Sequence, residues 1–193
     1  MTAARLIQKL RENRLRVFTT RTAATLLGVS PSAASQLLNR LAREKLLLRL
    51  KRGIWANLLA PSLRIEEAVP YLTDPWISYV SLYSALSEHG LIAEVPRQVY
   101  GVTAGRPGCW DTSLGRVSLH HIPADQVWGF EMKRTGDGSF PLATPEKAYL
   151  DTLYLASVPR SPIQKPPFRH PPRFDPKRMR EYLKKWDLRH LFP

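Results

Sequence analysis

Residues 19–47 read TTRTAATLLGVSPSAASQLLNRLAREKLL, and the capping residues within this stretch predict two helices joined by a sharp turn. Thr20 can cap a first helix that ends at Gly28, the usual residue for a left-handed terminal position. Ser30 then supplies a capping hydroxyl, and Pro31 suits the first position of a second helix. We expect the first of these helices to bury Ala23, Ala24 and Leu27.

The second helix has two clearly different faces. Its apolar positions recur with the i, i+3, i+4, i+7 spacing of a buried stripe, at Ala34, Leu37, Leu38 and Leu41. The opposite face carries polar and cationic side chains, namely Ser32, Ser35, Gln36, Asn39, Arg40 and Arg43. The amides of Gln36 and Asn39 can pair with adenine, and Arg40 can contact guanine or a phosphate. Such a face is typical of a recognition helix in the major groove of DNA.

A preceding helix and a basic hairpin flank this pair. Leu6, Ile7 and Leu10 fall on one face of the preceding helix, and a short strand is expected at Val17 and Phe18. Residues 46–57 (LLLRLKRGIWAN) predict a hairpin that carries three cations, Arg49, Lys51 and Arg52. This order predicts a winged helix-turn-helix that binds DNA. The alternatives are a small helical core whose polar face is only hydrated, and a winged helix that binds protein.

The charge of the chain is unevenly distributed. The 193 residues carry a net charge of +13, with 44% hydrophobic and 23% charged residues, which is ordinary for a protein with a packed core. Residues 1–60 hold 12 Lys and Arg against 2 acids, residues 61–158 hold 7 against 11, and residues 159–193 hold 10 against 3. A basic beginning and a basic end favour a polyanionic partner, although surface charge alone also fits a hydrated surface without one.

Several classes of protein are disfavoured by the sequence. No apolar run approaches the ~18–20 residues that a membrane span requires. The first residues (MTAARLIQKLREN) lack the apolar stretch of a secretory signal, so we expect a cytoplasmic protein without membrane contact. The single cysteine, Cys109, excludes an internal disulfide framework and a cysteine-based zinc site.

Three domains are expected: a winged helix-turn-helix over 1–60, an α+β domain over 61–158, and a Pro-rich basic segment with a terminal helix over 159–193. The second begins with a connector that holds a helix at 65–72. It continues with a helix over YVSLYSALSEHGL, which ends at Gly90 and buries Val80, Tyr83, Leu86 and Leu91. Three alternating runs (RQVYGVT, GRVSLHHI and VWGFEMKR) predict a small antiparallel sheet, and Thr144 caps a further helix. Asp175 and Pro176 begin the terminal helix.

The pieces TTRTAATLLGVSPSAASQLLNRLAREKLL, KRGIWA, YVSLYSALSEHGLI, PRQVYGVT and ATPEKAYLDTLY occur in one order, over about residues 5–155. This order resembles the AbiEi-type antitoxins of abortive-infection (type IV) toxin–antitoxin systems. The resemblance implies a winged helix that represses its own operon. We expect the protein to be a monomer or weak dimer in solution and to pair on an inverted-repeat operator in double-stranded DNA. The resemblance also implies an antitoxin domain that opposes a nucleotidyltransferase-like toxin without forming a stable complex with it. In that domain the matching positions are Ser81, Ala85, Leu86, Gly90, Pro145, Glu146, Lys147 and Asp151.

No catalytic, cofactor or metal site is expected. The five histidines are scattered; His120 and His121 point to opposite faces of a strand, and His89 is placed to close the end of a helix. Cys109 lies in a Gly- and Pro-containing loop without an evident base, and Glu146 is expected to be a first-turn acid. Two other functions stay open. One is a ligand-responsive winged-helix regulator without antitoxin activity, and the other is an interaction module or RNA-directed enzyme.

Overall fold

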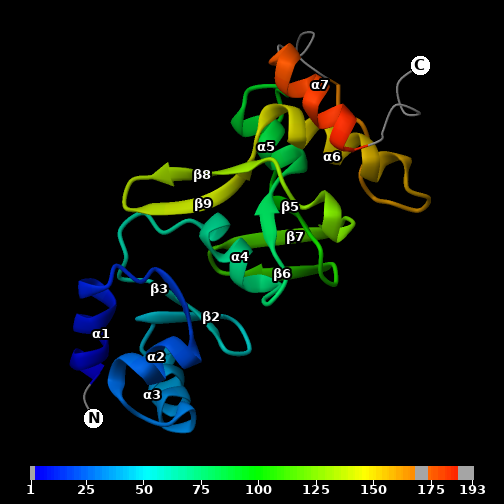
Figure 1. The fold of residues 1–193 in the computed structure, drawn as a ribbon. Helices are drawn as coiled ribbons and strands as arrows, with labels where there is room; N and C mark the ends of the chain where they lie inside the picture. The colour runs from blue at the N-terminus through cyan, green and yellow to red at the C-terminus, as the bar shows by residue number, and fades with distance from the viewer. Residues whose placement is uncertain (1–2, 168–173, 187–193) are drawn as a thin grey trace.

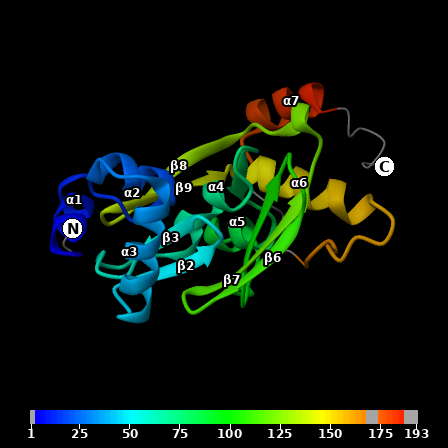
Figure 2. The same cartoon turned by 90° about the horizontal axis from the view of Figure 1, so that it is seen from below.

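The computed structural model of the chain describes residues 3–167 and 174–186. They form an elongated molecule with α1, α2 and α3 at one end and α7 at the other (Figure 1; Figure 2 shows it from below). Two sheets lie between these ends, a three-stranded sheet ordered β1-β3-β2 and a six-stranded sheet ordered β6-β7-β5-β4-β9-β8. No helix in the described part of the chain is long and apolar enough to cross a membrane. The fold class is α+β, as the sequence predicts.

The N-terminal part holds the elements expected from its sequence. Their bounds are α1 Ala3–Glu12, β1 Val17–Thr19, α2 Thr20–Leu27, α3 Pro31–Arg43, β2 Leu47–Lys51 and β3 Ile54–Asn57. Both β1 and β2 pair antiparallel with β3. Most of the predicted apolar positions are buried together, because Leu6, Leu10, Ala23, Leu27, Leu37, Leu38 and Leu41 share one cluster with Phe18, Leu47 and Trp55. Ala24 and Ala34 are buried outside this cluster, whereas Ile7 is only half-buried.

The caps of α2 and α3 differ from the prediction at one position. Thr19, rather than Thr20, caps α2, because its hydroxyl accepts from the backbone N–H of Thr22. The Thr20 hydroxyl instead accepts from the indole Nε1 of Trp55, 2.8 Å away. Gly28 ends α2 in the left-handed conformation (φ 67°), and the Ser30 hydroxyl accepts from the N–H of Ala33 at the start of α3. The two helices are thus joined by a tight, well-capped turn.

A connector with η1 Ile65–Ala68 and α4 Val69–Leu72 leads into the second part. The strands of that part are β4 Ser78–Val80, β5 Val99–Thr103, β6 Gly108–Thr112, β7 Gly115–His121, β8 Phe130–Thr135 and β9 Gly138–Ala143. The expectation of an antiparallel sheet is wrong, since β5 pairs parallel with β7, and β4 pairs parallel with β9. The β5–β7 pair is parallel because the β6–β7 hairpin folds back and places its second strand beside β5.

Two local predictions for this part are also wrong. The helix expected over YVSLYSALSEHGL begins only at Leu82, since Ser78–Val80 is a buried central strand and α5 spans Leu82–Glu88. Three residues are too few to show an alternating pattern, so the strand is hidden in a run with helical spacing. Cys109 is in strand β6 instead of a loop, and its thiol is exposed.

Helices α5, α6 Pro145–Ser157 and α7 Pro176–Lys185 lie at the end of the molecule opposite to α3 (Figure 1). Thr144 caps α6 and Asp175 caps α7, with Pro145 and Pro176 as first residues, as predicted. A single-turn helix, η2 Ala124–Gln126, precedes β8. Parts of the Pro-rich segment and of the expected terminal helix, including His170 and His190, lie outside the described residues.

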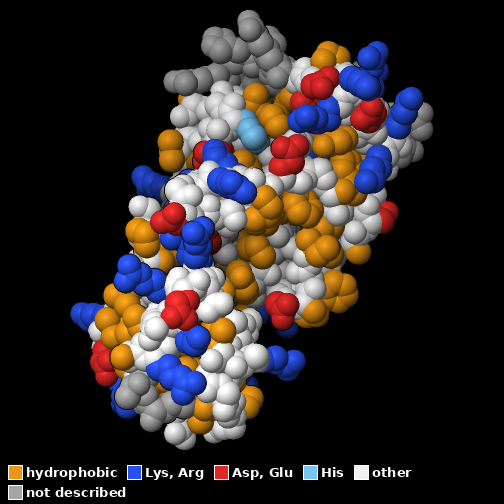
Figure 3. Space-filling view, turned by 60° about the vertical axis from the view of Figure 1, so that its left-hand side comes forward, with side chains coloured by type: hydrophobic (Ala, Val, Ile, Leu, Met, Phe, Trp, Pro, Cys, Tyr) orange, Lys and Arg blue, Asp and Glu red, His pale blue; other side chains and the backbone are white. Residues whose placement is uncertain are grey.

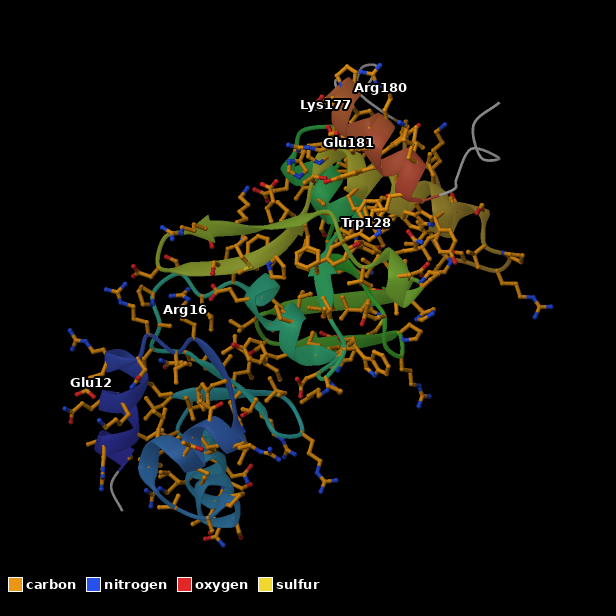
Figure 4. The ribbon with its side chains drawn as sticks, viewed as in Figure 1. Glu12, Arg16, Trp128, Lys177, Arg180 and Glu181 are labelled. Atoms are coloured by element: carbon orange, nitrogen blue, oxygen red, sulfur yellow. The ribbon has the colours of Figure 1, made fainter. Side chains whose placement is uncertain are left out.

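The two parts share a buried junction. Arg16 donates from Nε and Nη2 to the two carboxylate oxygens of Glu67, at 2.6 and 3.0 Å, and both side chains are buried. Figure 4 shows Arg16 between α1 and the β8–β9 hairpin. The Lys51 ammonium donates to the carbonyl of Leu72, at 2.8 Å. Residues of the first sheet also belong to the core of the second part, namely Val17, Leu50, Ile54 and Ala56. The orientation of the N-terminal helices is therefore fixed relative to the six-stranded sheet.

Candidate nucleic-acid interface

The buried stripe of α3 determines which of its side chains face solvent. Ala34, Leu37, Leu38 and Leu41 are buried, so the opposite face turns outward. On that face Ser32, Gln36, Arg40 and Arg43 are exposed, while Ser35 and Asn39 are half-buried. The six-stranded sheet does not cover this helix, which lies at the far end of the molecule (Figures 1 and 2). This face is accessible to a large partner.

The two amide side chains of this face differ in their availability. Asn39 Nδ2 donates to the backbone carbonyl of Ser35, 2.9 Å away on the preceding turn of the same helix. Gln36 forms no hydrogen bond within the described residues, and its amide is free to pair with a base edge. Bidentate pairing by Asn39, which the sequence also predicts, would require the bond to Ser35 to break. Gln36 is thus the better placed of the two for an adenine contact.

The hairpin of β2 and β3 presents two of its three predicted cations. Arg52 is exposed in the turn beside Gly53, whose φ is 82°. The Arg49 guanidinium is exposed and lies 5.8 Å from the centre of the Trp55 ring. Lys51 departs from the expectation, because its ammonium donates to the Leu72 carbonyl at the end of α4. A register shift between Arg49 and Lys51 accompanies this turn of the chain. Lys51 therefore serves the junction between the two parts.

One exposed cation at the same end of the molecule, Arg21, is not among the predicted contacts. Arg21 is exposed in the first turn of α2, the position from which the first helix of a helix-turn-helix contacts the DNA backbone. It lies two residues after the Thr19 cap, and this proximity to a helix start is a signal that the sequence contains. In the described residues no ion pair involves the exposed arginines of α2, α3 and the β2–β3 hairpin, namely Arg21, Arg40, Arg43, Arg49 and Arg52. Figure 3 shows Lys and Arg side chains projecting from several points of this end.

A tight pair of capped helices, with an exposed polar and cationic face on the second, fits the helix-turn-helix class of fold. Residues 5–57, which contain this pair and both flanking strands, match a family model described as a transcriptional regulator, AbiEi antitoxin. The match confirms the resemblance seen in the sequence over these residues. No curated protein matches the chain.

The second part brings together three of the eight positions of the antitoxin pattern, Ser81, Lys147 and Asp151. Asp151 accepts from the Ser81 hydroxyl at 2.7 Å and from the Tyr79 hydroxyl at 3.1 Å, and it pairs with the Lys147 ammonium one turn away on α6. Pro145 is the first residue of the same helix, whereas Gly90 lies apart, just beyond α5. The pattern therefore marks a buried polar cluster instead of an exposed surface.

Glu146 lies in the first turn of α6, as expected, and it also contacts α7. It is buried, and its Oε1 accepts from the backbone N–H of Asp175 at 2.8 Å. Its Oε2 lies 3.5 Å from the guanidinium of Arg178. Glu146 thereby holds the beginning of α7 against α6.

Lys147 and Asp151 form an ion pair without solvent contact, with both side chains 0% exposed. Burial raises the pKa of Asp151 and lowers the pKa of Lys147, because both charged forms lose their hydration. Burial also raises the pKa of Tyr79, with the Asp151 charge acting in the same direction. The Lys147 ammonium lies 4.3, 4.8 and 5.5 Å from the ring centres of Trp186, Trp128 and Tyr79. Trp128 and Trp186 cover the Lys147 ammonium on the side of helix α7, and Figure 4 shows Trp128 beneath that helix.

The remaining chemical candidates do not assemble into a site. His121 Nδ1 lies 3.0 Å from the Gly105 carbonyl, while His120 Nε2 lies 3.1 Å from the Ser118 hydroxyl. Burial lowers the pKa of His120. His89 is the C-cap of α5, but its ring contacts the Ala143 carbonyl on β9, at 2.8 Å, instead of its own helix. Among the described residues no three His, Cys, Asp or Glu side chains are grouped in a way that could hold a metal ion.

Proposed function

We propose that this protein is a DNA-binding transcriptional autorepressor and antitoxin of a type IV toxin–antitoxin system, with a role in defence against phage. The observation that best supports this proposal is the exposed polar and cationic face of α3, which lies within the residues that match the AbiEi regulator family. The α2–α3 pair acts as a winged helix-turn-helix, and the β2–β3 hairpin is its wing. This reading makes the protein a cytoplasmic regulator, and it requires no catalytic site, cofactor or metal.

In this proposal the helix reads bases and the surrounding arginines hold phosphates. Gln36 and Arg40 contact base edges, with Ser32 and Ser35 beside them, because short polar side chains at the beginning of α3 allow close approach to the groove. Phosphate contacts come from the exposed cations around the helix, Arg21, Arg43, Arg49 and Arg52. Two copies on an inverted repeat would block the promoter of the operon.

The experiment is a titration of operator DNA at increasing salt concentration. If each protein engages about six phosphates, log K falls against log salt with a slope of about −5, at roughly −0.9 per contact. Gln36→Ala or Arg40→Ala should each cost about 1–3 kcal/mol and relax the preference at one base position. Arg49→Gln and Arg52→Gln should weaken all duplex sequences alike.

Arg106→Gln is the matched control, because Arg106 is exposed and forms no ion pair within the described residues, yet belongs to the second part. It should leave operator binding unchanged. A slope near zero would refute DNA binding through phosphates. Equal behaviour of the helix and hairpin variants would refute the assignment of α3 as the reading element.

The antitoxin role has a separate test. A nucleotidyltransferase encoded beside this gene should arrest growth when expressed alone, and co-expression of this protein should restore growth. Arg40→Ala should weaken repression and retain rescue, because the proposed rescue belongs to the second part. Co-purification of the two proteins as a stable complex would contradict the mode of action that we propose.

A second function, a ligand-responsive regulator, is favoured by one observation. The second part holds a cavity of about 710 Å³ that is distant from the DNA-binding face and within the size range of small-molecule sites. In that case a metabolite would change the affinity of the protein for its operator, and growth rescue would be absent.

A further inference from the structure

The cavity of about 710 Å³ lies between α5, strands β5 and β7, the loop before β5, and the chain segment that follows α6. Its outer wall is held in place by Tyr83, whose hydroxyl donates to the Gln164 carbonyl and accepts from the Gln164 N–H, both at 2.7 Å. Ile163, which precedes Gln164, is buried in the core of the second part. These contacts hold the outer wall of the cavity to α5 and to the core of the second part.

One side of the cavity is cationic. Arg97, Arg116 and Lys165 line it, and Glu94 is the acid among its lining residues. Residues 61–158 hold only seven Lys and Arg against eleven acids, and three of those cations, Arg64, Lys133 and Lys147, are in ion pairs.

Two of the other four, Arg97 and Arg116, lie at this cavity, exposed and without an ion pair in the described part of the chain. Residues 61–158, although acidic overall, therefore place two guanidinium groups without an ion pair at the same cavity. This arrangement suits a phosphate, which arginine can bind with two parallel hydrogen bonds.

The other side of the cavity is aromatic and apolar. Tyr83 and Tyr100 line it with their rings edge to face, 5.0 Å apart, and Ile92 and Pro96 extend the wall. The Tyr100 ring is supported from β7 by His120, with ring centres 6.1 Å apart and nearly parallel planes. A flat heteroaromatic ring can lie against such a wall, because tyrosine rings bind nucleobases by stacking and edge contacts.

We propose that this cavity binds a nucleotide, with its base against Tyr83 and Tyr100 and its phosphates at Arg97 and Arg116. The cavity combines an aromatic wall with a cationic wall, which a sugar, a free amino acid or an inorganic anion would use only in part. A free nucleotide and one nucleotide unit of a single strand share this chemistry. The proposal is independent of operator binding, since neither wall includes a residue of the N-terminal part.

The test is calorimetric titration of the full chain with each of the four ribonucleoside triphosphates. The corresponding nucleosides, inorganic triphosphate and ten-residue single-stranded oligonucleotides are titrated for comparison. We expect one triphosphate to bind at one site per chain, and its nucleoside and inorganic triphosphate to bind at least tenfold more weakly. Arg97→Gln and Arg116→Gln should each weaken binding at least tenfold. The controls Arg106→Gln and Arg134→Gln remove exposed, unpaired arginines outside the cavity and should have no effect.

Each outcome decides the proposal. Binding of an oligonucleotide without binding of any free triphosphate would support the site and assign it to a nucleic-acid strand. Equal binding of inorganic triphosphate, equal loss in the control variants, or no binding of any probe would overturn it. Gln36→Ala and Arg40→Ala should retain nucleotide binding and weaken operator binding. Arg116→Gln should weaken nucleotide binding and retain operator binding, so failure of either proposal is recognised separately.

Discussion

The buried pair of Lys147 and Asp151 supports a quantitative prediction about stability. Both side chains are fully buried, and Asp151 also accepts from the hydroxyls of Tyr79 and Ser81. Asp151→Leu leaves an ammonium and two hydroxyls without their acceptor, so it should cost about 5 kcal/mol, the upper end of the range for breaking a buried pair. Lys147→Met should cost about 3 kcal/mol, because Asp151 keeps both hydroxyl donors and can take up a proton.

The double variant Lys147→Met with Asp151→Leu removes both charges and should cost at least about 2 kcal/mol less than the sum of the two single variants. Unfolding in urea, followed by tryptophan fluorescence, measures all four free energies. The reasoning would be refuted if each single variant cost less than about 1 kcal/mol and the two costs added up in the double variant. That result would show that the pair is hydrated or does not interact.

The pH dependence of the Lys147→Met variant has a definite sign. Burial already raises the pKa of Asp151, and loss of the neighbouring ammonium removes the largest opposing influence. A folded-state pKa above the unfolded value of about 3.9 means that the native state binds the proton more tightly. The contribution of Asp151 to stability is then present at low pH and is lost as the pH rises through the folded pKa. The loss of unfolding free energy caused by Lys147→Met should therefore be smaller at pH 5 than at pH 8. The opposite trend would contradict this account.

Four further predictions follow from the junction of the two parts and from the turn before α3. Arg16→Met should cost about 3–5 kcal/mol in urea unfolding, since it leaves the buried Glu67 carboxylate unpaired. Gly138→Ala should cost about 1–3 kcal/mol, because the added Cβ would lie 2.5 Å from Glu67 Oε1. Lys51→Met should lower the free energy of unfolding by about 1 kcal/mol, because it removes the bond to the Leu72 carbonyl. It should leave operator affinity within about twofold, whereas Arg52→Gln should weaken operator binding. Equal losses of affinity in the two variants would show that Lys51 contacts DNA. Gly28→Ala should cost about 1–2 kcal/mol by thermal unfolding, because its φ of 67° is unfavourable for a residue with a Cβ.

The N-terminal fold was predictable because its signals are local. Gly28, Ser30 and Pro31 act within a few residues of their own positions, and the apolar stripe of α3 is complete within eight residues. The second sheet was not predictable to the same degree, since its strand order depends on contacts between distant segments. Strand β4 has only three residues, and β9 contains Pro141, which usually argues against a strand.

The candidate sites divide in the same way. The exposure of Gln36 and Arg40 follows from the helical period, which can be read from the sequence alone. The engagement of Lys51 with Leu72 could not be predicted, because the partner is a backbone carbonyl 21 positions away. The Lys147–Asp151 pair has the i, i+4 spacing of a common surface pair. Only the tertiary packing of Trp128, Trp186 and Tyr79 around it makes the pair buried.

The junction also bears on how the two proposed binding functions can influence each other. The first sheet contributes Val17, Leu50, Ile54 and Ala56 to the same core that includes Tyr79 and Val99 of the second sheet. Strand β5, which begins at Val99, carries Tyr100 of the proposed nucleotide site. A ligand that favours one arrangement of β5 therefore acts on the core against which the β2–β3 hairpin packs.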